Sequence, residues 1–206
     1  WFSELTPLSR PPHSRVEHSL ESVESYVRDF AEDNPHVNVT LLRFANVLGA
    51  DIVTPISRAL ELPLVPSIFG FDPRLQFVHE DDVVGSSLFV LERQLPGIYN
   101  VAGDGRRRGS EVARLCGKRT VPMPPVGTGL ATWPLNRIGV PLPPELLELL
   151  RYGRGVDNRH LKEAGFVYPY TSAGAVRAFI EAGRLRQTIG STTPAYRYER
   201  DVEQFF

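Results

Sequence analysis

The chain of 206 residues contains a single cysteine, Cys116, and this scarcity excludes an internal disulfide and a cysteine-based zinc site. Its five histidines do not stand at a zinc-ligand spacing either, so we expect no metal. The formal net charge is only -1, which argues against phosphate neutralisation on nucleic acids or lipid surfaces. No apolar run approaches the roughly 18 residues that a membrane helix requires. We therefore expect a cytoplasmic protein with neither a nucleic-acid nor a membrane partner.

Methionine is also scarce, because Met123 is the only one and the chain begins at Trp1. Residues 1–12 are rich in polar residues and proline and show no periodicity. We therefore expect the chain to be a part of a longer protein. Apolar residues make up 42% of the sequence, which is enough for one core of ordinary size.

The first regular pattern predicts a helix over 14–32 followed by a strand. Ser14 and Glu17 form a capping-box pattern, and Asn34-Pro35 ends the helix. The strand, 37–44 (VNVTLLRF), is almost continuously apolar near its end, as in a parallel sheet buried on both faces. This order is typical of an α/β fold. The apolar stripe of the helix consists of Val16, Leu20, Val23, Val27 and Phe30.

Two further strands and a helix are predicted downstream. Leu75 to His79 and Ile98 to Val101 have strand composition, and Asp81-Asp82 begins a helix between them. We expect this helix to bury one face, made of Val83, Val84, Leu88 and Leu91.

Four stretches in this order resemble one family. LLRFANVLG (41–49), LQFVHEDDVV (75–84) and GIYNVAGDG (97–105) are similar to the "LRPxNVYG", "RDFVHVDDVA" and "YNVGxG" motifs of the extended short-chain dehydrogenase/reductases, the NAD-dependent epimerase/dehydratase group. The stretch 150–171 resembles the carboxy-terminal "D-x-x-x-L-x-x-x-L-G-F-x-P" element of that family. The resemblance covers about residues 7–180.

The resemblance implies the carboxy-terminal part of a Rossmann-like parallel sheet plus a small mixed α/β substrate domain. Residues 1–50 would be the last strand and helix units of the Rossmann-like domain. Residues 51–186 would bind the substrate, with 77–101 rejoining the main sheet, and 187–206 would be a tail. Relatives often pair through the helix that corresponds to 14–32, so the resemblance also implies a homodimer.

The predicted site lies where the first strand ends, because wound α/β sheets bind ligands beyond the carboxyl ends of their strands. In the family, Asn46 would contact a small-molecule substrate such as a nucleotide sugar, and the backbone of Phe44 and Ala45 would lie near the nicotinamide of NAD or NADP. The alternative is that Asn46 only ends the strand. His79 resembles the family's strand-end residue, and for it we favour a structural role.

The substrate pocket of this chain is expected to differ from the family's. Leu75 stands where the family has arginine, and Arg74 comes one residue earlier, so the two side chains point to opposite faces of a regular strand. Leu75, Phe69 and Phe71 therefore predict an apolar mouth, suited to a less charged substrate or to no small substrate. Arg151 is too close to Asp157 to match the family's later arginine, and 106–108 has the composition of a solvated corner.

Two family features have no counterpart in the sequence. The glycine-rich turn that holds the cofactor pyrophosphate is absent, since Gly103-Asp104-Gly105 lacks the spacing that follows. The catalytic Tyr-x-x-x-Lys pair falls on Val16 and Leu20, or on His13 and Glu17 if the alignment shifts. Val16 and Leu20 cannot move a proton, whereas His13 could.

These observations leave two hypotheses open. The first is an NAD(P)-dependent epimerase, dehydratase or reductase that uses another acid or base. The second is a catalytically degenerate relative that binds a dinucleotide as a regulator or scaffold.

Overall fold

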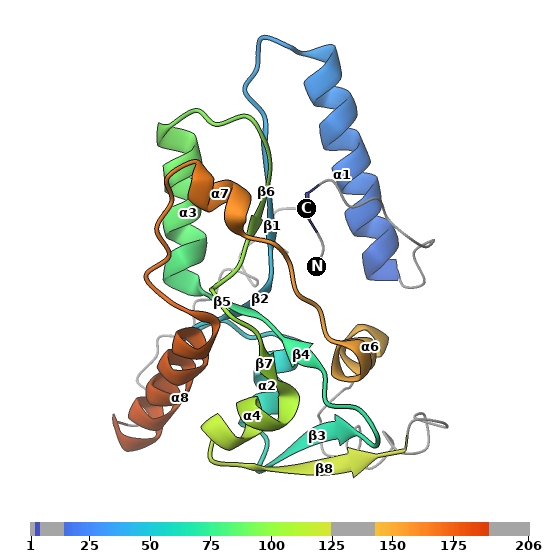
Figure 1. Ribbon diagram of the computed structural model, residues 1–206, viewed down its shortest axis with the longest axis vertical. Coiled ribbons are helices and arrows are strands. Elements are labelled where there is room, and N and C mark those ends of the chain that lie inside the picture. Colours follow the sequence, from blue (N-terminus) through green and yellow to red (C-terminus); the bar gives the residue numbers. More distant parts are fainter. Residues whose placement is uncertain (1–2, 5–14, 125–142, 190–206) are drawn as a thin grey trace, which may run out of the picture.

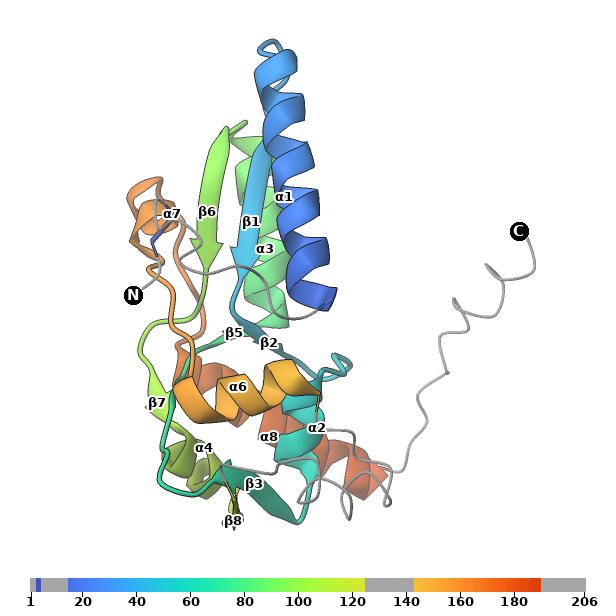
Figure 2. The ribbon, with the colours of Figure 1, turned by 90° about the vertical axis from the view of Figure 1, so that its right-hand side faces the viewer.

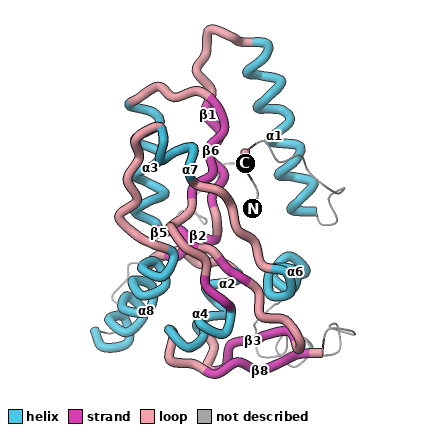
Figure 3. Tube along the Cα trace, in the orientation of Figure 1, coloured by secondary structure: helices cyan, strands magenta, loops and turns pink. Residues whose placement is uncertain are grey.

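The computed structural model describes residues 3–4, 15–124 and 143–189, which form an elongated α/β molecule (Figure 1). Short strand pairs follow one another along its length, from β1–β6 through β2–β5 and β4–β7 to β3–β8 (Figure 3). The strands are β1 (Thr40–Phe44), β2 (Asn46–Leu48), β3 (Leu64–Ile68), β4 (Arg74–Leu75), β5 (Phe77–His79), β6 (Gly97–Val101), β7 (Arg107–Arg108) and β8 (Arg119–Met123).

The helices begin and end with recognisable signals. Thr54 caps α2 with a reciprocal capping box, and Gly153, with a φ of 68°, follows α6 at its carboxyl end. None of the helices in the described ranges is long and apolar enough to cross a membrane. They are α1 (Arg15–Asp33), α2 (Pro55–Glu61), α3 (Glu80–Glu92), α4 (Gly109–Leu115), α6 (Pro144–Tyr152), α7 (Arg159–Glu163) and α8 (Ser172–Ile189).

The parallel pairs confirm the α/β class expected from the sequence. β1 pairs with β6 from Thr40↔Gly97 to Phe44↔Val101, and β2 pairs with β5 from Asn46↔Phe77 to Leu48↔His79. Beyond β6, the Gly103 N–H donates to the Phe77 carbonyl at 2.9 Å. β5 therefore lies between β2 and the chain that leaves β6, at the carboxyl end of the β1–β6 pair.

Helices α1 and α3 lie on opposite sides of the β1–β6 pair (Figures 1 and 2). The predicted helix over 14–32 is present, but its apolar stripe is largely exposed, with Leu20 at 64% and Val23 at 59%. Of the four apolar residues predicted to be buried on α3, Val83 packs against a core, whereas Val84, Leu88 and Leu91 are exposed. The fully buried residues of the helix are Asp82, Ser86 and Val90.

Strand β5 joins two apolar cores, because consecutive side chains on a strand point to opposite faces. Phe77 belongs to the larger core, which α2, α4, α6 and α8 cover, and Val78 belongs to the smaller one between α3, β6 and α7. Both side chains are fully buried. The functional geometry described next is built on the residues that flank this strand.

Candidate functional site

A pocket with a volume of about 500 Å³ opens beside β4, and its lining is rich in arginine. Three segments that lie far apart in the sequence build it, namely residues 70–74, the turn at 106 and residues 151–155. Its arginines are Arg74, Arg106, Arg151 and Arg154.

The first wall of the pocket, residues 70–74, is tied to the beginning of α4. The Asp72 carboxylate accepts hydrogen bonds from the Ser110 N–H at 2.9 Å and the Ser110 hydroxyl at 2.7 Å. The Gly109 N–H donates to the Pro73 carbonyl at 2.9 Å. These bonds fix the direction of the Asp72 carboxylate, which keeps its negative charge on the wall that also bears Arg74.

The second wall, residues 151–155, lies directly against β4. A Cβ atom on Gly153 would stand 2.4 Å from the Arg74 carbonyl oxygen, so only glycine fits this approach. Leu75 and Arg154 form a parallel bridge one residue further along. The close backbone contact sets the separation between Arg74 and the arginines of this wall.

The side chains of the pocket combine positive charge with aromatic surface. The Arg151 guanidinium lies 5.8 Å from the ring centre of Phe71 and 5.9 Å from that of Tyr152. Arg154 forms an ion pair with Glu17 of α1 at 2.9 Å. Guanidinium groups bind phosphate and carboxylate through paired hydrogen bonds, so the pocket is suited to an anion.

The strand end predicted as the ligand site lies next to this pocket. The Asn46 side-chain amide donates to the Gln76 carbonyl at 2.9 Å, two residues beyond Arg74. The Ala45 N–H is bonded to the Val101 carbonyl at 2.9 Å, and Phe44 is 40% exposed. Asn46 thus adjoins the arginine pocket through Gln76 without lining it.

His79 caps the beginning of α3. Its Nδ1 accepts a hydrogen bond from the Asp81 N–H at 3.2 Å, and its ring stacks on Tyr170 with the centres 3.9 Å apart. The sequence predicts that the helix begins at Asp81-Asp82, but His79 caps it. Asp82 is instead fully buried. Burial raises the pKa of Asp82, and the field of His79 and the backbone N–H groups of Tyr170 and His79 act in the opposite direction.

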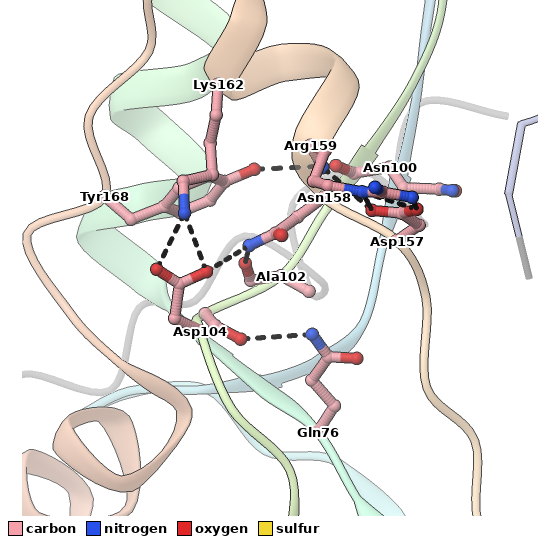
Figure 4. Close-up of polar contacts among 10 residues, drawn as sticks. Gln76, Asn100, Ala102, Asp104, Asp157, Asn158, Arg159, Lys162 and Tyr168 are labelled. Atoms are coloured by element: carbon pink, nitrogen blue, oxygen red, sulfur yellow. Dashed lines mark hydrogen bonds and ion pairs between the residues drawn. The ribbon is translucent and has the colours of Figure 1, made fainter. Parts of the chain in front are cut away.

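A polar network holds the chain that leaves β6 (Figure 4). The Asn158 amide donates to the Ala102 carbonyl at 2.7 Å and to Asp104 at 2.9 Å, and Lys162 also donates to Asp104 at 2.9 Å. These two donors lower the pKa of Asp104, Lys162 having the larger effect. A Cβ on Gly103 would stand 2.7 Å from the Ser172 nitrogen. The 103–105 turn therefore serves packing.

The structure brings together a set of residues different from the predicted one. Arg74 lines the pocket, but Leu75 is 2% exposed and lies in the larger core, so the apolar mouth expected from its side chain is a misinterpretation. Arg107 and Arg108 are exposed, as the predicted solvated corner requires, whereas Arg106 is half-buried and lines the pocket. Arg151 and Arg154 were missed because their sequence spacing does not match the family's. His13 lies outside the described residues.

Comparison with known proteins gives relatives by sequence and by structure. No family model matches the chain. Uncharacterized proteins of Mycobacterium tuberculosis and Mycobacterium bovis are 33% identical over 180 residues, which cover 84% of this chain and 47% of theirs. The chain thus spans about half the length of the curated relatives it matches.

Solved structures with a similar fold share low sequence identity with the chain. The dTDP-glucose 4,6-dehydratase of Bacillus anthracis in complex with NAD has a TM-score of 0.63 at 17% identity, over 91% of this chain and 56% of that one. The UDP-glucose 4-epimerase of Thermus thermophilus, also with NAD, has a TM-score of 0.62 at 18% identity, over 87% and 59%. The UDP-glucuronic acid 4-epimerase of Bacillus cereus has the same TM-score at 13% identity, over 93% and 57%. The chain therefore has the Rossmann-like α/β fold of these proteins.

Proposed function

We propose that the chain is the substrate-binding part of an NAD(P)-dependent epimerase, dehydratase or reductase that acts on a sugar nucleotide or a related alcohol. The observation that carries this proposal is the gathering of four arginines in one pocket beside the strand end that bears Asn46. The similar solved structures are those of a sugar-nucleotide dehydratase and two epimerases, which supports the same reaction class. In this proposal residues 51–186 bind the substrate and residues 1–50 belong to the Rossmann-like domain.

The chemistry of the pocket favours a nucleoside diphosphate group. Arginines on both walls can share the phosphate oxygens, because each guanidinium offers two parallel N–H donors. Tyr152 is 64% exposed at the pocket and can stack on an aromatic base. A free sugar offers neither phosphate charge nor an aromatic ring, so it should bind weakly.

The described residues do not fit the pyrophosphate of the cofactor. A dinucleotide pyrophosphate needs backbone N–H groups of a glycine-rich turn at the beginning of a helix. The Gly103-Asp104-Gly105 turn packs against Ser172 and cannot serve this purpose. When bound, NAD or NADP would supply hydride transfer. This chain would contribute at most the wall formed by the backbone of Phe44 and Ala45.

Calorimetric titration of the full-length protein tests the proposal. UDP-glucose and dTDP-glucose should bind, and glucose should not. Arg74→Gln and Arg154→Gln should each weaken binding by on the order of 10- to 100-fold, because each removes a charge-assisted hydrogen bond. Arg107→Gln is the control, since Arg107 lies next to the pocket on β7 without lining it. Equal losses in all three variants, or no binding by the unaltered protein, would contradict the proposal.

The second candidate is a catalytically degenerate protein that binds a dinucleotide as a regulator or scaffold. The observation that favours it is the absence of a Tyr-x-x-x-Lys pair where the family has one, with Val16 and Leu20 in its place. Hydride exchange between NADH or NADPH and a bound nucleotide sugar distinguishes the two functions. Exchange at a substrate carbon supports the enzyme, and tight cofactor binding without exchange supports the regulator.

A second copy of the chain is the partner that we propose for α1. Its apolar residues Leu20, Val23 and Tyr26 are all more than half exposed. Exposed apolar rows on a helix are typical of association surfaces. Pairing of two such helices would form a symmetric dimer.

A further inference from the structure

Gln76 occupies the short gap between β4, which borders the arginine pocket, and β5, which pairs with the strand of Asn46. It is 3% exposed, and both ends of its side-chain amide are used. The amide oxygen accepts a hydrogen bond from the Val156 N–H at 2.9 Å. The amide nitrogen donates to the Gly103 carbonyl at 3.1 Å (Figure 4). Gln76 therefore joins the second wall of the pocket to the chain that leaves β6.

The main chain of Gln76 makes the third connection. Its carbonyl accepts the hydrogen bond from the Asn46 side chain at 2.9 Å, which fixes the direction of that amide. One buried residue thus contacts the strand end that bears Asn46, the segment that carries Arg151 and Arg154, and the backbone beyond β6. Buried polar connections with every partner satisfied rigidify the groups that they join.

The hydrogen bond between Gln76 and Val156 affects the position of the wall that carries Arg151 and Arg154. Residues 151–155 contact β4 through their backbone, at Gly153 and at the Leu75–Arg154 bridge. The Gln76–Val156 hydrogen bond follows immediately after this bridge and holds the end of the wall. An apolar side chain at position 76 would leave the Val156 N–H and the Gly103 carbonyl without these partners, which is costly for buried groups.

We infer that Gln76 is a positioning residue that holds the arginine-bearing wall, residues 151–156, in a fixed relation to Asn46. Gln76 contacts no ligand in this assignment and acts through the residues that do. The part of the inference that concerns substrate binding rests on the proposed function. The geometric part does not, and it can be tested without any ligand.

The ligand-free test is NMR spectroscopy of the full-length protein with Gln76→Met. The amide proton of Val156 should lose protection against hydrogen exchange, and the shifts should concentrate in residues 151–156 and in the Asn46 side-chain amide. Gln76→Glu, which keeps an oxygen for the Val156 N–H, should retain most of that protection. Shifts spread evenly over the larger core, or full protection of Val156 in Gln76→Met, would overturn the inference.

The matched control is Ser172→Ala. Ser172 is fully buried and accepts a hydrogen bond from the Phe77 N–H at 3.0 Å, so this variant loses one buried hydrogen bond beside β5, where Gln76→Met loses two, without touching the pocket. If Gln76 only stabilised the fold, each variant would affect the pocket amides in proportion to its loss of unfolding free energy. That result would also overturn the inference.

Titration with UDP-glucose completes the design. Gln76→Met should bind about tenfold more weakly, the loss expected from one misplaced hydrogen-bonding group, and Ser172→Ala should bind as the unaltered protein does. In an Arg154→Gln background the effect of Gln76→Met should largely disappear, because both act on the same wall. Undiminished affinity, or strictly additive losses, would refute the positioning role. No binding by the unaltered protein refutes the proposed function alone, and the NMR result then decides on Gln76.

Discussion

Two glycines with the same backbone angle allow the pocket wall to be tested by alanine substitution. Gly153 and Gly117 both have a φ of 68°, a conformation that alanine adopts only with strain. They differ in their surroundings. A Cβ on Gly117 would meet nothing within 4 Å, whereas a Cβ on Gly153 would lie 2.4 Å from the Arg74 oxygen and 2.9 Å from the Arg74 nitrogen. Gly153 also has a ψ of 175°, which only glycine adopts readily, so alanine there meets both backbone strain and the contact with β4.

The magnitudes follow from these two effects. Gly117→Ala should lower the free energy of unfolding by about 1 kcal/mol, the cost of a left-handed conformation. Gly153→Ala should cost more in backbone strain alone, ~1–3 kcal/mol, because its ψ of 175° lies in a region that only glycine adopts readily. Overpacking adds a further ~1–3 kcal/mol, because the new Cβ must displace backbone and not a flexible side chain. At about 2–4 °C per kcal/mol for a chain of this size, the two melting temperatures should be clearly resolved.

The assay is urea unfolding of both variants followed by circular dichroism, with UDP-glucose titration at a temperature where both are folded. Gly153→Ala should be the less stable and should bind more weakly, since the wall that carries Arg154 must move away from Arg74. Gly117→Ala should bind normally. Equal unfolding free energies for the two variants would show that the wall does not press on β4, and the explanation of the pocket geometry would be wrong.

Three other predictions concern the rest of the molecule. Burial raises the pKa of Asp82 in the folded state, so the stability that its protonated form contributes is lost as pH rises from 3.8 through the pKa of the folded state. Asp82→Asn should therefore raise the unfolding free energy at pH 7 by roughly 1–3 kcal/mol. An unfolding free energy in urea that does not increase would contradict this prediction. Asn158→Ala should cost roughly 1–3 kcal/mol in the same assay because it leaves a buried carbonyl unpaired, whereas Lys162→Gln should cost less than about 1 kcal/mol because its ion pair is exposed. Leu20→Glu combined with Tyr26→Glu should convert a dimer to a monomer in analytical ultracentrifugation, and an unchanged sedimentation coefficient would exclude α1 as the dimer surface.

The helices were predictable wherever local chemistry decides. Thr54-Pro55 marks the beginning of α2, and Gly153 marks the end of α6, because caps and left-handed glycines act within a few residues. The inner face of α3 was not predictable from hydropathy. Its inward row contains Asp82 and Ser86, and apolar periodicity cannot identify a polar residue that is buried.

The pocket could be predicted only in part for a different reason. Arg74 was identified from its place beside a family motif, but the other arginines come from segments more than 30 residues away in the sequence. Their meeting depends on Gly153 and on the hydrogen bond between Gln76 and Val156. Tertiary contacts of this kind leave no local pattern in the sequence, so the sequence alone gives no indication that these arginines meet in one pocket.

The same contacts change how the strand-end asparagine must be tested. β5 ends at His79, and the carbonyls of Ala102 and Gly103 beyond β6 are paired by the side chains of Asn158 and Gln76. Asn46 belongs to this arrangement through its bond to Gln76, so Asn46→Ala removes a structural hydrogen bond together with any contact to a ligand. A loss of binding in that variant alone cannot distinguish the two roles. Arg74 is exposed at the pocket, so Arg74→Gln changes its charge while leaving that hydrogen-bond arrangement intact, and it is the substitution that separates ligand binding from folding.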